Sequence, residues 1–319
     1  MKKSWMWFGC CLLLAAMPSL GADVGTITIL DGKPKLLRGT MWHSLAEGVR
    51  IRDGDVIDLP EKSQVQVEMN DGGALGVIGP GALYAVSATP RDAKQAGTAE
   101  FMITRGWIKL DTKPKATRLR VRAALGTVTA SDAAAVARIA PEGLDVFVES
   151  GAAKISEPGK ADGSGGEIKA GGFAARAPGK PFTFDARAPS PFIGALPRDF
   201  MDPLPTRAMK FASSRVEPGA DREATYAEVQ PWLSGPYRAS FIKRFEPKLA
   251  DPAFRAAAEA NSKANPEWTS AAKAKVEPAK EKEKEKEQEK EKEKEKEKEK
   301  EKEKAPARTW HWPWERKSP

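Results

Sequence analysis

The sequence predicts a mainly β protein with a small helical appendage and a highly charged tail. The segment "VQVEM" alternates apolar and polar residues with the period of 2 that a half-buried strand requires. About a dozen such short segments follow one another between residues 23 and 187, with turns between them and no convincing amphipathic helix. Near the C-terminus a run of alternating glutamate and lysine has no apolar residue with which to join a core.

The first 22 residues have the three-part layout of a secretory signal peptide. Two lysines precede an uncharged, mostly apolar stretch, and small residues then lead to Ala22. The apolar stretch has about a dozen residues, whereas a helix that spans a bilayer needs roughly 20. We therefore expect a cleavable signal and export to the periplasm, not an integral membrane protein. Both cysteines of the chain lie inside the signal, so we expect no disulfide in the mature protein.

The predicted β domain covers residues 23–187. Its first strand, Thr26 to Leu30, is rich in β-branched residues and ends at an Asp-Gly turn. The uncharged stretch from Gly72 to Ala88 contains five glycines and Pro80, so it predicts two short buried strands that meet at Gly79-Pro80-Gly81. Further strands follow with "FMIT", "WIKL", "LRVR", "GTVTA", "AVARI", "DVFVE", "AAKI" and "EIKA".

A glycine-punctuated motif, W-x-x-L-x-x-G-x-x-I-x-x-G-D-x-I, runs from Trp42 to Ile57. Its glycines, Gly48 and Gly54, stand where the chain must bend tightly, with a positive φ that costs glycine little. Asp53-Gly54-Asp55 is typical of a turn whose carboxylates accept hydrogen bonds from nearby backbone N–H groups. Ile51 and Ile57 are expected to point into the core on either side of that turn.

This motif, together with Asp71-Gly72 and "FMITRGWIKL", resembles the FecR-type domain over roughly residues 24–155. The resemblance implies a compact β-sandwich or a short β-helix-like fold. It also implies a periplasmic protein that binds or senses a partner. The chain departs from the regulators of that family, because it has no segment that resembles their cytoplasmic sigma-binding part and no membrane-spanning helix after it.

The remaining chain divides by composition. Residues 188–221 are rich in proline and predict an extended linker packed against its neighbours. Residues 222–268 predict a helical segment with three helices, which begin near Thr225, Ser234 and Asp251. Seven side chains of this segment are expected to form one small apolar core, namely Trp232, Tyr237, Phe241, Phe245, Leu249, Phe254 and Trp268.

Residues 269–304 predict a disordered spacer, because twelve glutamates and eleven lysines alternate over residues 281–304. The last segment, 305–319, carries Trp310, Trp312 and Trp314 beside basic residues. Tryptophan prefers the membrane–water interface, so these three residues are candidates for docking to a membrane surface or a partner's groove. An extension that arose by repeat slippage and has no role is the alternative.

The sequence contains no persuasive catalytic, cofactor-binding or metal-binding set. The histidines are His43 and His311, which do not suggest a zinc site, and phosphate-loop and nucleophile-elbow motifs are absent. Ser240 and Lys243 match the S-x-x-K spacing of serine acyl-enzymes, but the accompanying motifs are missing. The net charge of +8 is modest and comes without nucleic-acid-binding motifs, so we expect no nucleic acid as partner.

Three functional hypotheses follow from these observations. The first is an exported, non-catalytic binding or sensing module of the Gram-negative envelope, with an envelope protein, a glycan or peptidoglycan as ligand. The second is a serine hydrolase that uses Ser240 and Lys243. The third is a structural adaptor that holds other envelope proteins together.

Overall fold

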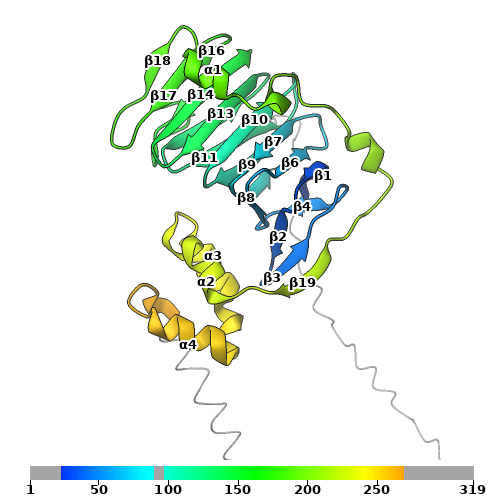
Figure 1. Cartoon of the computed structure of the whole chain (residues 1–319), viewed down its shortest axis with the longest axis vertical. Coiled ribbons are helices and arrows are strands. Elements are labelled where there is room, and N and C mark those ends of the chain that lie inside the picture. The colour runs from blue at the N-terminus through cyan, green and yellow to red at the C-terminus, as the bar shows by residue number, and fades with distance from the viewer. Residues whose placement is uncertain (1–22, 90–96, 269–319) are drawn as a thin grey trace, which may run out of the picture. The chain divides into compact units, whose positions relative to one another are not determined.

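The computed structural model describes residues 23–89 and 97–268 and confirms the mainly β prediction, with 44% strand and 20% helix. The chain divides into two compact units, one ending at Ala224 and one beginning at Thr225 (Figure 1). The predicted signal peptide (1–22), the predicted spacer (269–304) and the Trp-rich segment (305–319) lie outside the described residues. Among the described residues, no helix has the length and apolar character needed to cross a membrane.

Unit 1 is built from two sheets. Sheet A has this strand order: β18 (Thr183–Asp185), β17 (Phe173–Arg176), β14 (Gly143–Ser150), β13 (Ala134–Ala140), β10 (Gly106–Asp111), β7 (Ala74–Ile78), β6 (Gln64–Glu68), β1 (Asp23–Asp31), β4 (Arg50–Arg52). Sheet B has this order: β16 (Gly166–Lys169), β15 (Ala152–Ser156), β12 (Gly126–Ala130), β11 (Arg118–Ala123), β9 (Thr98–Ile103), β8 (Gly81–Thr89), β5 (Val56–Leu59), β2 (Lys35–Arg38), β3 (Met41–Ser44), β19 (Gly219–Glu223).

The chain alternates between these sheets, usually after a hairpin or a pair of strands. Strands β6 and β7 lie in sheet A, β8 and β9 in sheet B, and β13 and β14 again in sheet A. The strand pairs are antiparallel except for β9 with β11. The stacked strands are visible in Figure 1. Of the two architectures that the FecR-type resemblance implies, this arrangement of two sheets about one core is the sandwich.

One continuous hydrophobic core lies between the sheets. It takes Val65 and Val67 from β6, Phe101 from β9 and Val121 from β11, all of which are almost fully buried. The neighbouring residues of these strands point away from this core, as the period of 2 predicts. The prediction that β6 is only half-buried is wrong, because the segment around residue 206 covers its polar residues. The predicted strands at 74–78 and 81–89 are confirmed, and the turn between them carries the chain from sheet A to sheet B.

Glycines stand at this and other turns because larger residues would not fit. A Cβ on Gly81 would overlap the carbonyl oxygen of Arg105. Gly48 and Gly54 have φ values of +89° and +88°, as the motif predicts. A Cβ on Gly48 would in addition lie 2.7 Å from Cγ2 of Val216.

The proline-rich segment after β18 packs along the outer face of sheet A (Figure 1). We call residues 189–211 the strap. It contains α1 (Ser190–Ala195), η1 (Arg198–Phe200) and η2 (Ala208–Phe211). Phe192 contacts the rings of Trp107 and Phe173, with centroids 5.3 and 5.1 Å apart. Phe200 is fully buried over Gly76, where a Cβ would lie 2.9 Å from its ring.

Polar side chains of sheet A hold the backbone of the strap. The Lys109 ammonium is fully buried and donates to the carbonyl oxygens of Phe200 and Asp202, each at 2.9 Å. It also pairs with the Glu149 carboxylate at 2.7 Å. The Glu68 carboxylate accepts from the backbone N–H groups of 207 and 208 at 2.8 and 3.0 Å. Beyond the strap, residues 219–223 form strand β19 and pair with β3, so this part of the predicted linker and helical segment is a sheet edge.

Unit 2 is helical and contains α2 (Tyr226–Val229), η3 (Gln230–Ser234), α3 (Arg238–Phe245), η4 (Glu246–Ala250) and α4 (Pro252–Ala260). The predicted capping box is confirmed, because the Thr225 N–H donates to Glu228 at 2.9 Å. Asp251 caps α4 as predicted by accepting from the N–H of Ala253 at 2.9 Å. An aromatic core includes the buried side chains of Phe241, Phe245, Phe254 and Trp268, as predicted. Tyr226 is also buried in this core and contacts Trp268, which the sequence did not predict.

Candidate functional site

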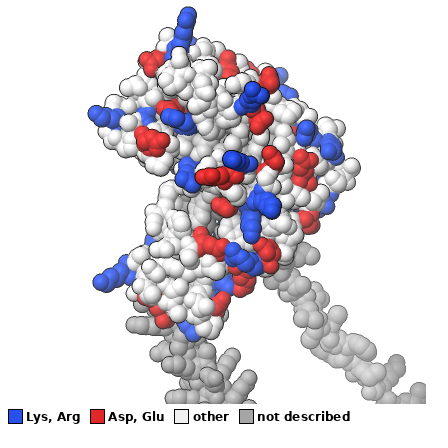
Figure 2. All heavy atoms as spheres, in the orientation of Figure 1, with Lys and Arg blue, Asp and Glu red and all other residues white. Residues whose placement is uncertain are grey.

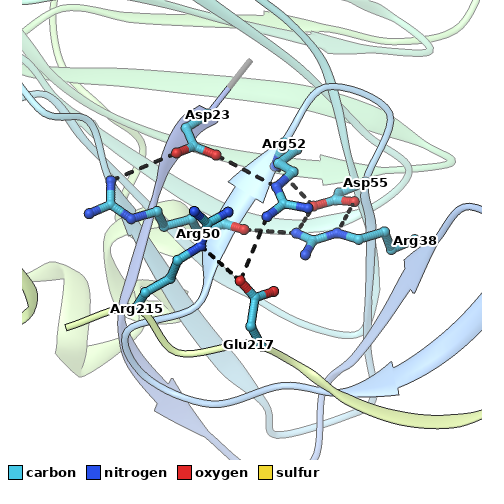
Figure 3. Close-up of polar contacts among 7 residues, drawn as sticks. All are labelled: Asp23, Arg38, Arg50, Arg52, Asp55, Arg215 and Glu217. Carbon is cyan, nitrogen blue, oxygen red and sulfur yellow. Dashed lines mark hydrogen bonds and ion pairs between the residues drawn. The ribbon is translucent and has the colours of Figure 1, made fainter. Parts of the chain in front are cut away.

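The glycine-punctuated motif is the centre of a polar network (Figure 3). The Asp55 carboxylate is buried, with 2% of the residue exposed, and accepts from the Nε and Nη2 atoms of Arg38 at 3.0 and 2.6 Å. The backbone N–H of Arg52 donates to the same carboxylate at 2.9 Å. These bonds confirm that an aspartate of the Asp-Gly-Asp turn accepts from a backbone N–H group. Arg38 also reaches the Arg50 carbonyl oxygen, at 2.8 Å, and thereby joins β2 to β4.

The network continues toward the surface through four more ion pairs (Figure 3). Asp23 lies 3.8 Å from Arg50 and 3.7 Å from Arg52, while Glu217 lies 3.9 Å from Arg52 and 2.8 Å from Arg215. Each carboxylate therefore faces one or more guanidinium groups. The arrangement ties the segment around residue 216 to β4 and ties β4 to β1, with four guanidinium groups facing three carboxylates. We therefore interpret the network as one that stabilises the fold, not as a ligand-binding site.

A different region of unit 1 contains charged side chains without partners. A groove of about 520 Å³ lies over the ends of β11, β12, β15 and β16 in sheet B. Its charged and polar walls are formed by Arg118, Lys154, Asp132, Asp162, Glu167, Thr129 and Ser131. The side chains of Arg118, Lys154, Asp132 and Glu167 make no hydrogen bond or ion pair with any residue that the structure describes. These four are available to a ligand.

Two small residues, Gly151 and Ala152, belong to the lining of the groove. Gly151 has a φ of +68°, and a Cβ there would overlap the carbonyl oxygen of Asp132. Ala152 follows it, opposite Lys169 of β16. A glycine that its turn requires and a methyl side chain thus stand where the surrounding residues have long charged side chains. This difference in side-chain length creates the depression.

One wall of the groove is fixed by hydrogen bonds. The Oδ1 atom of Asp162 accepts from Thr129 Oγ1 at 3.0 Å and from Ser156 Oγ at 3.3 Å. The Ser156 hydroxyl in turn accepts from the Gly163 N–H at 2.8 Å. Thr129 and Ser156 are almost fully buried, so they hold the loop of residues 157–165 against sheet B. The loop presents Asp162 in one defined position.

The charged row beside the groove is internally paired. Glu100 of β9 lies 2.5 Å from Arg122 and 3.8 Å from Arg120, both on β11. On the face of the molecule in Figure 2, basic and acidic side chains are interspersed, and no broad field of one sign covers unit 1. The four charged side chains of the groove differ from this neighbouring row in that they form no ion pair with a described residue.

The candidate residues from the sequence analysis do not line the groove. Ser240 and Lys243 are both exposed on α3, and neither side chain makes a hydrogen bond or an ion pair within the described part of the chain. His43 lies on β3, between Leu36 of β2 and Ala220 of β19. Among residues 23–89 and 97–268, no group of histidine, cysteine and acidic side chains could hold a metal ion.

The docking candidates Trp310, Trp312 and Trp314 lie outside the described residues, as does His311.

The groove itself was not predicted from the sequence. Its walls come from four strands spread over fifty residues, and the relevant signal, charged residues alternating with apolar ones in "RLRVR" and "AAKI", is common to most exposed strands.

The fold and the groove define a two-sheet β protein with a polar surface groove. No protein-family profile and no curated protein matches the chain. Two crystal structures of a "putative anti-sigma factor" from Parabacteroides distasonis ATCC 8503 are similar to it, with 12% and 11% identity and a TM-score of 0.33 each. Each alignment covers 41% of this chain and 59% of the other, so the chain spans about three fifths of those structures. A similarity of this size assigns neither a family nor an activity.

Proposed function

We propose that the chain is an exported, non-catalytic binding or sensing module of the Gram-negative cell envelope, of FecR type, whose ligand occupies the groove over β11, β12, β15 and β16. The observation that carries the proposal is the set of four unpaired charged side chains that line the groove together with Gly151 and Ala152. Free surface charges are common, but here both signs converge on one depression with a hydrogen-bonded wall. The signal-like first 22 residues support an envelope location for this ligand.

The other polar clusters of unit 1 support binding less well. The Asp55 network is satisfied internally, and Lys109 and Glu68 bind the strap. The hydrolase alternative lacks support from geometry, because the Lys243 amine makes no hydrogen bond to the Ser240 hydroxyl that it would have to activate. An adaptor would need a broad contact surface, and nothing in the described residues marks one as clearly as the groove is marked.

The binding proposal is tested with the mature chain, residues 23–319, immobilised and exposed to purified peptidoglycan sacculi and to detergent-solubilised envelope. The test variant combines Arg118→Glu with Lys154→Glu. The matched control combines Lys33→Glu with Lys263→Glu, two exposed lysines outside the groove, so that both variants have the same net charge. Retention by the wild type and the control, lost in the groove variant, is the expected result. Equal retention by all three proteins would remove the groove as the binding site.

Export and the absence of catalysis have separate tests. Protein recovered from the periplasm of a Gram-negative host should begin at Ala22 or Asp23 when its N-terminus is sequenced. A cytoplasmic protein that keeps its first 22 residues would contradict export. Serine-reactive probes should label the wild type and Ser240→Ala equally or not at all, and labelling that depends on Ser240 would contradict the non-catalytic assignment.

A further inference from the structure

The groove combines opposite charges in a way that restricts its ligand. Two cations, Arg118 and Lys154, and three carboxylates, Asp132, Asp162 and Glu167, surround it. A site for a polyanion such as a phosphorylated lipid head group would concentrate cations, because carboxylates nearby repel the ligand. A site for a cation would have the opposite excess. The near balance of charge indicates a ligand that carries both signs itself.

The strand register places opposite charges side by side on β15 and β16 without an ion pair between them. Lys154 on β15 stands opposite Glu167 on β16, yet the two side chains form no ion pair. Arg118 lies on β11, at the other side of the groove, two strands away from Lys154. Neighbouring strands are roughly 4.8 Å apart, so the distance across the groove from β11 to β16 is roughly 14 Å. This width fits a ligand of about the size of a short peptide or a disaccharide.

The lining favours a peptide-like head group over a neutral sugar. Sugar rings are usually held by an aromatic side chain that stacks on one face, and the groove has no aromatic residue in its lining. Ionic ligand groups, in contrast, form charge-assisted hydrogen bonds that are roughly twice as strong as neutral ones. The exposed hydroxyl of Ser131 adds a donor and an acceptor of the kind that amide groups require.

We propose that the groove binds a zwitterionic amino-acid head group, whose carboxylate contacts Arg118 and Lys154 and whose ammonium contacts Asp132 and Glu167. This inference rests on the proposed function and names the ligand chemistry of the same site. In the cell envelope such a head group occurs on stem peptides of peptidoglycan that contain a diamino acid with its second amino and carboxyl groups free. Free peptides carry the same two charged groups, and the experiment distinguishes these sources.

The first experiment titrates the mature chain with a soluble muropeptide that has a diamino-acid stem, by isothermal titration calorimetry. The same fragment is tested after N-acetylation, which removes the ammonium, and after amidation, which removes the carboxylate. Each modification is expected to weaken binding about ten-fold or more, as the loss of a charge-assisted contact implies. A free tripeptide serves as the second source. Equal affinity for the tripeptide would show that the head group alone is recognised, and weaker affinity would assign the site to the cell-wall fragment.

The second experiment assigns each charge to its partner. Arg118→Ala should reduce the discrimination between the carboxylate and its amide and leave discrimination at the ammonium unchanged. The double variant Asp132→Asn with Glu167→Gln should reduce the discrimination between the ammonium and its N-acetylated form. It should leave the discrimination between the carboxylate and its amide unchanged. All three positions are exposed, so we expect these variants to fold normally, and circular dichroism checks this expectation. Lys33→Ala is the control, and it should change neither the carboxylate-to-amide nor the ammonium-to-acetyl affinity ratio.

The outcomes separate the two proposals. Groove-dependent retention of sacculi or envelope material, with no difference between the unmodified and modified fragments, overturns the zwitterion inference and leaves the binding proposal standing. Loss of groove-dependent retention in every assay overturns both. Discrimination that persists in Arg118→Ala and in the double variant places the zwitterion elsewhere on the protein and also overturns the inference.

Discussion

The buried Lys109 ammonium allows a quantitative prediction about the strap. The substitution Lys109→Met keeps the aliphatic length of the side chain but removes the donor to two carbonyl oxygens and to Glu149. Each buried acceptor left without a partner costs about 1–3 kcal/mol, and breaking a buried ion pair costs about 3–5 kcal/mol. Glu149 is 25% exposed and can recover some hydration, which favours the lower end of these ranges. These costs overlap because one ammonium makes all three contacts, so we expect the free energy of unfolding of unit 1 to fall by at least about 3 kcal/mol.

Hydrogen exchange measured by mass spectrometry over a urea series would test this prediction, because it reports unit 1 separately from unit 2. Peptides from residues 197–208 should lose protection first, since the strap loses two of its anchoring bonds. Lys113→Met is the matched control. Lys113 is exposed and has only a 3.4 Å contact to Thr206, so its loss should change stability by less than about 0.5 kcal/mol. A decrease below about 1 kcal/mol for Lys109→Met, with normal strap protection, would refute the reasoning.

Three further substitutions test the turns and caps. Asp55→Asn should lower the free energy of unfolding by about 3 kcal/mol in the same assay, because it breaks a buried bidentate pair, whereas Asp53→Asn in the exposed part of the turn should have a much smaller effect. Gly81→Ala should reduce the yield of folded protein, measured by gel filtration, because its Cβ overlaps a backbone carbonyl oxygen. The hydrogen bond from Lys248, followed by the N–H groups of α4, lowers the pKa of Asp251 below its usual 3.8. Its ionised form therefore stabilises unit 2 above the unfolded-state pKa, and that contribution is lost as the pH falls through the folded-state value. The helical circular dichroism signal should therefore fall less steeply with decreasing pH in Asp251→Asn than in the wild type. The same pH dependence in both proteins would contradict this prediction.

Local patterns in the sequence were sufficient for many strands of unit 1 and for several of its turns. Alternation placed Val65 and Val67 on the core side of β6, and the glycine spacing located the turns at Gly48 and Gly54. These features depend on a few neighbouring residues, and backbone sterics decide them locally. The capping box at Thr225 is local in the same sense.

Features that depend on distant segments could not be predicted. Lys109 has the position of a solvent-facing residue in an alternating strand, and only carbonyl oxygens about ninety residues further along explain its burial. Strand β19 has five exposed residues and no apolar alternation, so its pairing with β3 leaves no trace in its sequence. The groove depends on the register of four strands and on the side-chain length of Ala152 relative to its neighbours. Periodicity determines which face a residue occupies, but it does not say what covers that face.

The difference between the two outer faces of the sandwich determines where a ligand can bind. On sheet A, a ligand would have to displace the strap, which buries Phe192 and Phe200 and receives hydrogen bonds from Lys109. Each buried phenylalanine contributes about 1.5–3 kcal/mol and each net hydrogen bond about 0.5–1.5 kcal/mol. Opening the strap therefore costs roughly 5 kcal/mol or more, which leaves fewer than roughly one molecule in a thousand open and reduces the apparent affinity by the same factor. The groove on sheet B has no such cost, because its charged side chains are already exposed and Asp162 is already held in place. The proposed ligand would therefore reach the groove on sheet B without displacing any described segment of unit 1.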